Sequence, residues 1–107
     1  MAARVTENPD MSRFEIFDAV DEGGQEERAG FAEYHLYGKE IAFIHTEVDP
    51  RFGGRGLGGV LARAALDTAR DRELDVLPYC PFIRGWIGKH PEYVELVPEG
   101  QRARFGF

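Results

Sequence analysis

A run of glycines in the middle of the chain is the strongest indication of chemistry in this sequence. Its members are Gly53, Gly54, Gly56, Gly58 and Gly59, and Arg51 and Arg55 lie among them. Glycine has no Cβ atom, so a ligand can approach its backbone closely. Free N–H groups at the start of a helix bind anions. A close-packed structural turn is the alternative, but the predicted strand before the run and the predicted helix after it favour a phosphate or pyrophosphate site.

The type of phosphate ligand is narrowed by the context of the run. Gly54-x-Gly56-x-x-Gly59 matches the dinucleotide-binding pattern, but the preceding strand belongs to a predicted meander and the chain is too short for that fold. A P-loop requires Gly-Lys-Ser/Thr, which the run does not contain. Coenzyme A, which carries a pyrophosphate, remains as the ligand.

Cys80 is the one cysteine of the chain, and it directly precedes Pro81. Proline is well tolerated in the first turn of a helix, so we expect Cys80 at a helix N-cap, where the thiolate form is favoured. Cys80 would then accept an acyl group or protonate a departing thiolate. The alternative is a small buried hydrophobic residue. A single cysteine excludes an intrachain disulfide and a cysteine-rich zinc site.

His45 and Glu47 are candidates for moving a proton. They lie two residues apart on a predicted strand and therefore share one face of it. An amine that attacks a thioester must be neutral, so a nearby proton acceptor is useful. The alternative is a partly buried histidine with a solvated glutamate. We interpret His35 as structural and His90 as a packing or capping residue, and we expect no metal site.

Composition and charge restrict the class of protein. The chain has 107 residues, 43% of them hydrophobic, which suits one folded domain over residues 1–107. A net charge of −6 argues against a nucleic-acid partner and weakly favours cationic ligands such as amines. The sequence has no secretion signal and no apolar run long enough to span a membrane, so we expect a cytoplasmic protein without a membrane partner.

Hydrophobic periodicity predicts the elements that position these residues. We expect a meander of three strands at Arg13–Val20, Ala29–Tyr37 and Ile41–Val48. A helix at Leu57–Arg72 and a strand at Asp75–Tyr79 follow. A second helix is expected at Pro81–His90 and a last strand at Glu92–Val97. Strict alternation in the third strand places Phe43 and His45 on one face and Thr46 on the other. Phe82 and Trp86 are expected on the core face of the second helix. Residues 1–11 and 98–107 are expected to be loose tails around a core of about 12–97.

Three segments of the chain occur together in a known family. They are His45-Thr46-Glu47-Val48, the glycine run, and Pro78-Tyr79-Cys80-Pro81-Phe82 followed by His90-Pro91-Glu92-Tyr93. The glycine run resembles the acetyl-CoA-binding signature Gln/Arg-x-x-Gly-x-Gly/Ala of the GNAT N-acetyltransferase superfamily. The chain is similar to that superfamily over roughly residues 12–97, and more narrowly to its minimal single-domain group, the YjdJ type.

The resemblance implies a position for acetyl-CoA. Backbone amides of the glycine run would hold the pyrophosphate, the pantetheine arm would follow the third strand, and the thioester would point into a V between that strand and the one ending at Tyr79. The implied contacts are Thr46, Val48, Gly53, Gly54, Arg55, Gly56, Leu57, Gly58 and Gly59. Gly53 stands where the signature has Gln or Arg, although Arg51-x-x-Gly54-x-Gly56 also fits two residues earlier. With Gly53 at that position, Arg55 or Arg51 would supply the positively charged side chain near the pyrophosphate.

The resemblance also implies catalytic roles. Cysteine occupies the Cys80 position in the YjdJ-type group, where it is considered catalytic, whereas a tyrosine protonates the leaving thiolate in many other members. Tyr79 and Tyr93 therefore compete with Cys80, and His45 or Glu47 would act as general base.

From these inferences we expect an α+β fold with a mixed, mostly antiparallel sheet, two main helices and a glycine-rich loop at a helix N-terminus. The expected activity is acetyl-CoA-dependent transfer of an acetyl group to an amine of a small molecule or a protein, directly or through Cys80. Two alternatives have the same fold: a non-catalytic module that binds CoA or acyl-CoA, and a small interaction domain, which the departure at Gly53 favours.

Overall fold

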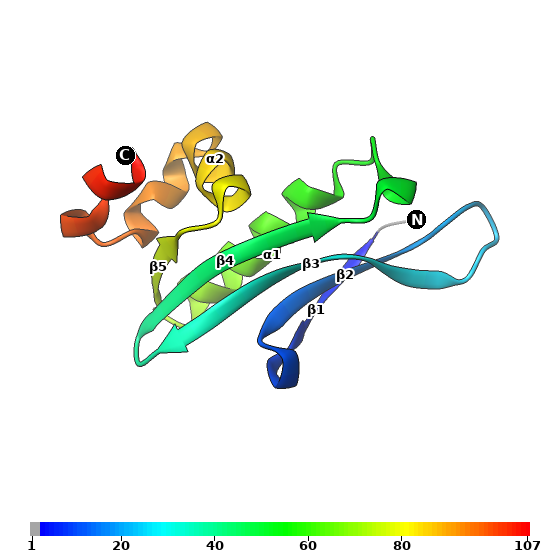
Figure 1. Ribbon diagram of the computed structural model, residues 1–107, viewed down its shortest axis with the longest axis horizontal. Helices are drawn as coiled ribbons and strands as arrows, with labels where there is room; N and C mark the ends of the chain where they lie inside the picture. The colour runs from blue at the N-terminus through cyan, green and yellow to red at the C-terminus, as the bar shows by residue number, and fades with distance from the viewer. Residues whose placement is uncertain (1–2) are drawn as a thin grey trace.

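The sheet has five strands in the order β1-β2-β3-β4-β5, as Figure 1 shows for the computed structural model, which describes residues 3–107. The strands are β1 (Arg4–Asn8), β2 (Arg13–Ala19), β3 (Glu26–Tyr37), β4 (Glu40–Val48) and β5 (Asp75–Pro78). Strands β1 to β4 form an antiparallel meander, and β5 is parallel to β4. The predicted α+β class with a mostly antiparallel sheet is confirmed.

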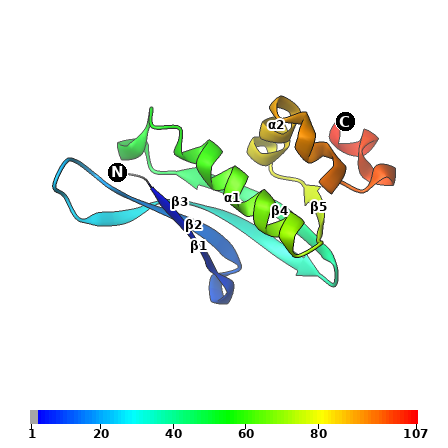
Figure 2. The ribbon, with the colours of Figure 1, turned by 180° about the vertical axis from the view of Figure 1, so that it is seen from behind.

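Helix α1 (Leu57–Asp71) makes the crossover that the parallel pair of β4 and β5 requires. The helix lies across one face of the sheet, and Figure 2 shows it from that side. Leu57, Leu61 and Ala65 recur every fourth residue, so they lie along one stripe of the helix and are buried. Within residues 3–107, no helix combines the length and the apolar character that crossing a membrane requires.

Helix α2 (Pro81–Lys89) starts and ends as predicted, with Cys80 at its N-cap and Pro91 just beyond its end. Its Ile83 and Ile87 are fully buried, and the helix packs against β4, β5 and α1. The predicted core face is only partly correct, because Phe82 is 43% exposed and Trp86 is partly buried. Both aromatic rings point toward α1, where they lie beside glycines of its first turn.

A β-bulge in β4 changes which of its residues share a face. Glu33 pairs with His45 and the next residue, Tyr34, pairs with Phe43, so Ile44 is an extra residue in β4. Phe43 contacts Phe14 on the helix-covered face, and Thr46 pairs with Ala32, which in turn pairs with Phe14. Phe43 and Thr46 therefore lie on the same face, which corrects the strict alternation predicted from the sequence.

Both ends of the chain are more ordered than predicted. Residues Arg4–Asn8 form strand β1, which pairs with β2 along its whole length. The predicted last strand at Glu92–Val97 is instead a 3-10 helix over Pro91–Leu96. Two more short 3-10 turns follow, and Phe105 in the last of them is only 5% exposed. Prediction failed here because the apolar residues of these segments are few and show neither helical nor strand periodicity clearly.

Candidate functional site

Unpaired backbone N–H groups collect where β4 leads into α1. Asp49 caps a 3-10 turn over Pro50–Phe52, and the chain then reaches α1 through Gly54 and Gly56. Their φ angles of +82° and +72° lie in the left-handed region, which side-chain-bearing residues rarely adopt. Within residues 3–107, no hydrogen bond engages the amides from Gly54 to Gly59. The predicted anion-binding loop therefore has its donors free.

Arg51 is bound to neighbouring carboxylates and not directed into the loop. Its guanidinium lies 2.9 Å from Glu27 and 3.1 Å from Asp49. The side chain and the backbone N–H of Arg51 both donate to the Asp49 carboxylate, and these bonds hold the pKa of Asp49 below its usual value. Arg51 therefore ties the turn to the start of β3.

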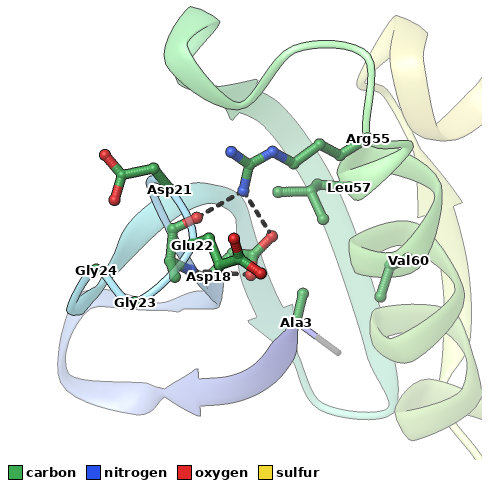
Figure 3. Close-up of a pocket in the computed structure, with 10 residues that line it drawn as sticks. Ala3, Asp18, Asp21, Glu22, Gly23, Gly24, Arg55, Leu57 and Val60 are labelled. Carbon is green, nitrogen blue, oxygen red and sulfur yellow. Dashed lines mark hydrogen bonds and ion pairs between the residues drawn. The ribbon is translucent and has the colours of Figure 1, made fainter. Parts of the chain in front are cut away.

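Arg55 is likewise occupied, as Figure 3 shows. Its guanidinium donates to the Asp18 carboxylate at 3.0 Å and to the carbonyl oxygens of Ala19 and Val20 at 2.6 Å each. These three bonds link the glycine loop to the end of β2, beside a cavity that Asp21 and Glu22 also line. Neither arginine that the sequence offers as a phosphate ligand is free in this arrangement.

Cys80 and Thr46 come together where β4 and β5 separate. The two strands pair only as far as Phe43 and Pro78, after which β4 continues alone to Val48. The Cys80 N–H donates to the Phe43 carbonyl at 2.8 Å, and its thiol donates to Thr46 Oγ1 at 3.3 Å. Cys80 is 2% exposed. The divergent strands give the predicted V, with the thiol on its wall and the edge of β4 open beyond it.

His45 and Glu47 form a pair on the opposite face of β4. His45 Nε2 lies 3.0 Å from Glu47 Oε1, which confirms that the two side chains share a face. Both are more than half exposed, and the His45 ring lies 6.0 Å from that of Phe31. Within the described residues, neither hydrogen-bonds to Cys80 or Thr46. The pair is therefore accessible to a molecule that approaches from the open face of the sheet.

The two tyrosines occupy different surroundings. Tyr79 is 41% exposed, and its ring packs edge-on against Phe105 with centroids 5.2 Å apart. Tyr93 is buried, and its hydroxyl donates to Asp67 at 2.6 Å. Burial, together with this hydrogen bond, raises the pKa of Tyr93. Within residues 3–107, no hydrogen bond joins either hydroxyl to Cys80.

A groove between α1 and α2 adds residues that the sequence analysis did not place in the site. It runs from Gly56 along α1 to Asp67, with Arg63, Trp86 and His90 beside it. We interpret Trp86 and His90 from the sequence as core and capping residues, although their spacing of four places His90, the C-cap of α2, on the same side as Trp86. Arg63 gave no signal because an exposed arginine is ordinary on a helix surface.

The fold and these groups together define a class of protein. A parallel β4–α1–β5 unit with free amides at the helix start, where β4 and β5 separate, is the architecture of an N-acetyltransferase domain. A family model for the GCN5-related N-acetyltransferases matches residues 13–96. The chain belongs to this family.

Individual relatives agree with this assignment. Protein NATD1 of Gallus gallus and of Mus musculus are each 35% identical over 65 residues, which are 58% of this chain and 59% of theirs. The match thus spans about three-fifths of these curated relatives. The solution structure of a GCN5-like candidate N-acetyltransferase from Staphylococcus aureus has a TM-score of 0.64 and 25% identity, and the match covers 88% of this chain and 86% of that one.

Proposed function

We propose that this protein transfers an acetyl group from acetyl-CoA to an amine. One observation carries the proposal: the open edge of β4 beyond Phe43 leads directly to the free amides of Gly54 to Gly59. The open strand edge offers backbone hydrogen bonds to an extended arm that contains amides, and the free amides beyond it offer N–H donors to a pyrophosphate. The pantetheine arm of CoA pairs with β4 around Thr46 and Val48, and the pyrophosphate lies at the start of α1.

The loop fits the pyrophosphate through its backbone. Gly53 replaces the signature's Gln or Arg, and Arg51 and Arg55 are engaged by carboxylates and carbonyls. Leu57 is buried, so its side chain anchors the helix while its N–H stays free. Amides at a helix start bind phosphate without a charged side chain. Affinity for the pyrophosphate therefore depends on the conformation of the loop.

Cys80 offers two chemical routes. In the first, the amine nitrogen attacks the thioester carbon, the carbon–sulfur bond to CoA breaks, and the Cys80 thiol protonates the departing CoA thiolate. In the second, the Cys80 thiolate takes the acetyl group and CoA leaves as the thiol with the Cys80 proton. The amine then attacks the acetyl-cysteine, and the thiolate departs. In both routes, His45 with Glu47 accepts the amine proton through water.

Acceptor approach is limited to one side of the sheet. Helices α1 and α2 cover the other side, where CoA would lie, whereas His45 and Glu47 are exposed on the open face. The amine therefore reaches the thioester through the V, and the two ligands enter from opposite faces. Two carboxylates near His45 favour a cationic amine: Glu47, and Glu33, which is the cross-strand partner of His45.

Intact mass and thermal stability, measured with acetyl-CoA, test this function. A melting temperature that rises until acetyl-CoA saturates is the expected result, because a ligand of the native state stabilises it. A gain of about 42 Da on the native chain, absent in Cys80→Ala, assigns the acyl-cysteine route, and stabilisation without that gain leaves direct transfer or binding alone. Release of CoA thiol with a panel of amines then measures turnover, with Cys80→Ser as the matched variant.

Three results contradict the proposal to different extents. Stabilisation without turnover on any amine indicates a CoA-binding module. No stabilisation at millimolar acetyl-CoA indicates an interaction domain that has the fold alone. Turnover that is unchanged in His45→Gln and Glu47→Gln removes the assigned base while leaving the transferase function intact.

A further inference from the structure

A small hollow lies on the open face of the sheet, where the pairing of β3 and β4 ends at Gly30 and Val48. Arg28, Phe31 and Glu47 line it, and Phe31 pairs directly with Glu47 across the two strands. Its volume of about 250 Å³ is just below the usual range for drug-sized ligands, so it suits a smaller molecule. None of its described lining residues belongs to the glycine loop or to the groove between α1 and α2.

Arg28 brings a positive charge to this hollow. Its guanidinium lies 3.6 Å from Glu15 Oε2, but the same oxygen is only 2.8 Å from Arg13. One carboxylate therefore serves two guanidinium groups, and one positive charge is left over. The Arg28 side chain is 47% exposed, and within residues 3–107 its guanidinium donates no hydrogen bond. Because an exposed guanidinium binds a carboxylate through two parallel N–H bonds, Arg28 offers an anchor for the carboxylate of a ligand.

Glu47 and His45 give the other end of the same surface the opposite character. The Glu47 carboxylate is 65% exposed, and its hydrogen-bond partner within residues 3–107 is His45 Nε2, at 3.0 Å. Glu33, the cross-strand partner of His45, adds a second carboxylate. The centre of the Phe31 ring is 6.0 Å from that of the His45 ring and 5.8 Å from Arg28 Cζ. An apolar ring thus separates a place for an anion from a place for a cation.

The strand register gives a bound molecule a direction. Strand β4 separates from β5 after Phe43, so His45 lies near the V. The pair of Phe31 and Glu47 comes next along the sheet, and Arg28 lies beyond it. A molecule with its carboxylate on Arg28 and its chain across the Phe31 ring therefore points its other end toward His45 and the V.

We infer that the acetyl acceptor is an ω-amino acid, a molecule in which a short aliphatic chain joins an amine to a carboxylate. Its carboxylate binds Arg28, its chain lies on Phe31, and its ammonium group meets the carboxylates beside His45. The inference rests on the proposed function and names its substrate class. The nitrogen bonds to the acetyl carbon and the carbon–sulfur bond breaks. Of the two protons that the nitrogen loses, one goes to His45 with Glu47 and the other appears on the CoA thiol.

Three amines with the same four-carbon chain test the inference: 4-aminobutanoate, butylamine and 1,4-diaminobutane. With acetyl-CoA, we expect kcat/KM to be at least about tenfold higher for 4-aminobutanoate than for either of the others, because only its carboxylate forms charged hydrogen bonds with Arg28. In Arg28→Gln this preference disappears. Arg4→Gln is the matched control and keeps the preference, since Arg4 lies over Phe17, the cross-strand partner of Arg28, and pairs with Glu26.

Binding is measured apart from turnover by a ¹H–¹⁵N titration of the full chain with 4-aminobutanoate. We expect saturable shift changes at the amides of Phe31 and Glu47, and we expect them to be lost in Arg28→Gln. Thermal melting without ligand shows whether that variant is folded. The comparison of the three amines on the wild type needs no variant and decides the inference if Arg28→Gln does not fold.

The outcomes separate this inference from the proposed function. If the three amines have equal kcat/KM, if 1,4-diaminobutane is preferred, or if the preference survives in folded Arg28→Gln, the inference is wrong while the transferase function stands. If no amine is acetylated but the titration shifts appear and depend on Arg28, the transferase function is wrong and the hollow remains a site for an amino acid. If neither turnover nor titration gives a signal, both are wrong.

Discussion

At the scale of single residues, the glycines of the loop serve different purposes. Gly54 and Gly56 adopt left-handed backbone angles that turn the chain into α1. Gly58 allows α2 to approach, since a Cβ atom there would lie 2.7 Å from the Phe82 ring. One short segment therefore needs glycine for two reasons: the left-handed backbone angles at Gly54 and Gly56, and the close approach of the Phe82 ring at Gly58. The amides of this segment have no hydrogen-bond partner within residues 3–107.

Gly56→Ala tests the conformational requirement. The left-handed region costs an alanine roughly 1–2 kcal/mol, so we expect this loss of unfolding free energy together with weaker acetyl-CoA binding. Urea unfolding and a ligand titration measure the two effects. Gly85→Ala is the matched control, because Gly85 lies inside α2 with open space around its Cα, and alanine there should stabilise by about 0.5–1 kcal/mol. Equal effects at both positions would contradict the assignment of strain to Gly56.

The sequence predicted the free backbone amides of the loop better than the partners of its arginine side chains. The free amides follow from the glycines and the helix that comes after them, which are local features. The ion pairs of Arg55 with Asp18 and of Arg51 with Glu27 join residues 37 and 24 positions apart. The contact between Cys80 and Thr46 likewise depends on how β4 and β5 meet. Such contacts are set by tertiary structure, and a single sequence carries little trace of them.

At the scale of elements, β1 is tied to the far end of α1 by one polar cluster. Glu7 of β1 accepts a hydrogen bond from the Tyr34 hydroxyl and pairs with Arg72 at 2.6 Å. Arg72 lowers the pKa of Glu7, and burial with the Glu7 bond raises the pKa of Tyr34 to about 12. The cluster holds the first strand, the third strand and the helix in register.

Glu7→Gln should reveal this cluster as a pH-dependent contribution to stability. Because the folded-state pKa of Glu7 is lowered, its contribution is present above the ordinary value of 4.5 and is lost as pH falls through the folded value. We expect a loss of about 1 kcal/mol at pH 7, limited by the half-exposed Arg72. Unfolding in urea at several pH values measures it. A difference from wild type that persists unchanged near pH 3 would show that the carboxylate charge is not the cause.

The bulge in β4 illustrates why the strands and helices were predicted better than the face of the sheet on which each side chain lies. The apolar patterns located the strands from β2 to β5 and both helices, with β5 found as a short buried run. One extra residue, Ile44, inverts the alternation after it, and no turn-forming residue marks its position. The inversion matters for function because it puts Thr46 beside Cys80 and leaves His45 on the open face. Strand β1 escaped prediction because its five residues are mostly polar and only partly buried.

At the scale of the whole molecule, the C-terminal residues are part of the fold. Phe105 is buried and packs against Tyr79, the residue that follows β5 and precedes Cys80. The Arg104 guanidinium lies 5.2 Å from the centre of the Tyr79 ring. The C-terminal segment thus packs against the residue that precedes Cys80.

Phe105→Ala should therefore destabilise the protein by about 3 kcal/mol, as for other buried phenylalanines. Phe107→Ala, at a partly buried position two residues later, should cost clearly less. Thermal or urea unfolding compares the two variants. If both cost the same small amount, the C-terminus is a loose tail and its contact with Tyr79 does not persist in solution.

The central claim is that backbone amides at the start of α1 hold the pyrophosphate of CoA, and nuclear magnetic resonance observes those amides one by one. A 107-residue chain is suited to a ¹H–¹⁵N titration with CoA. The account predicts the largest shift changes at the amides from Gly54 to Gly59, with smaller ones from Thr46 to Val48. Saturable binding that leaves those glycine amides unmoved, or no binding at all, would contradict it.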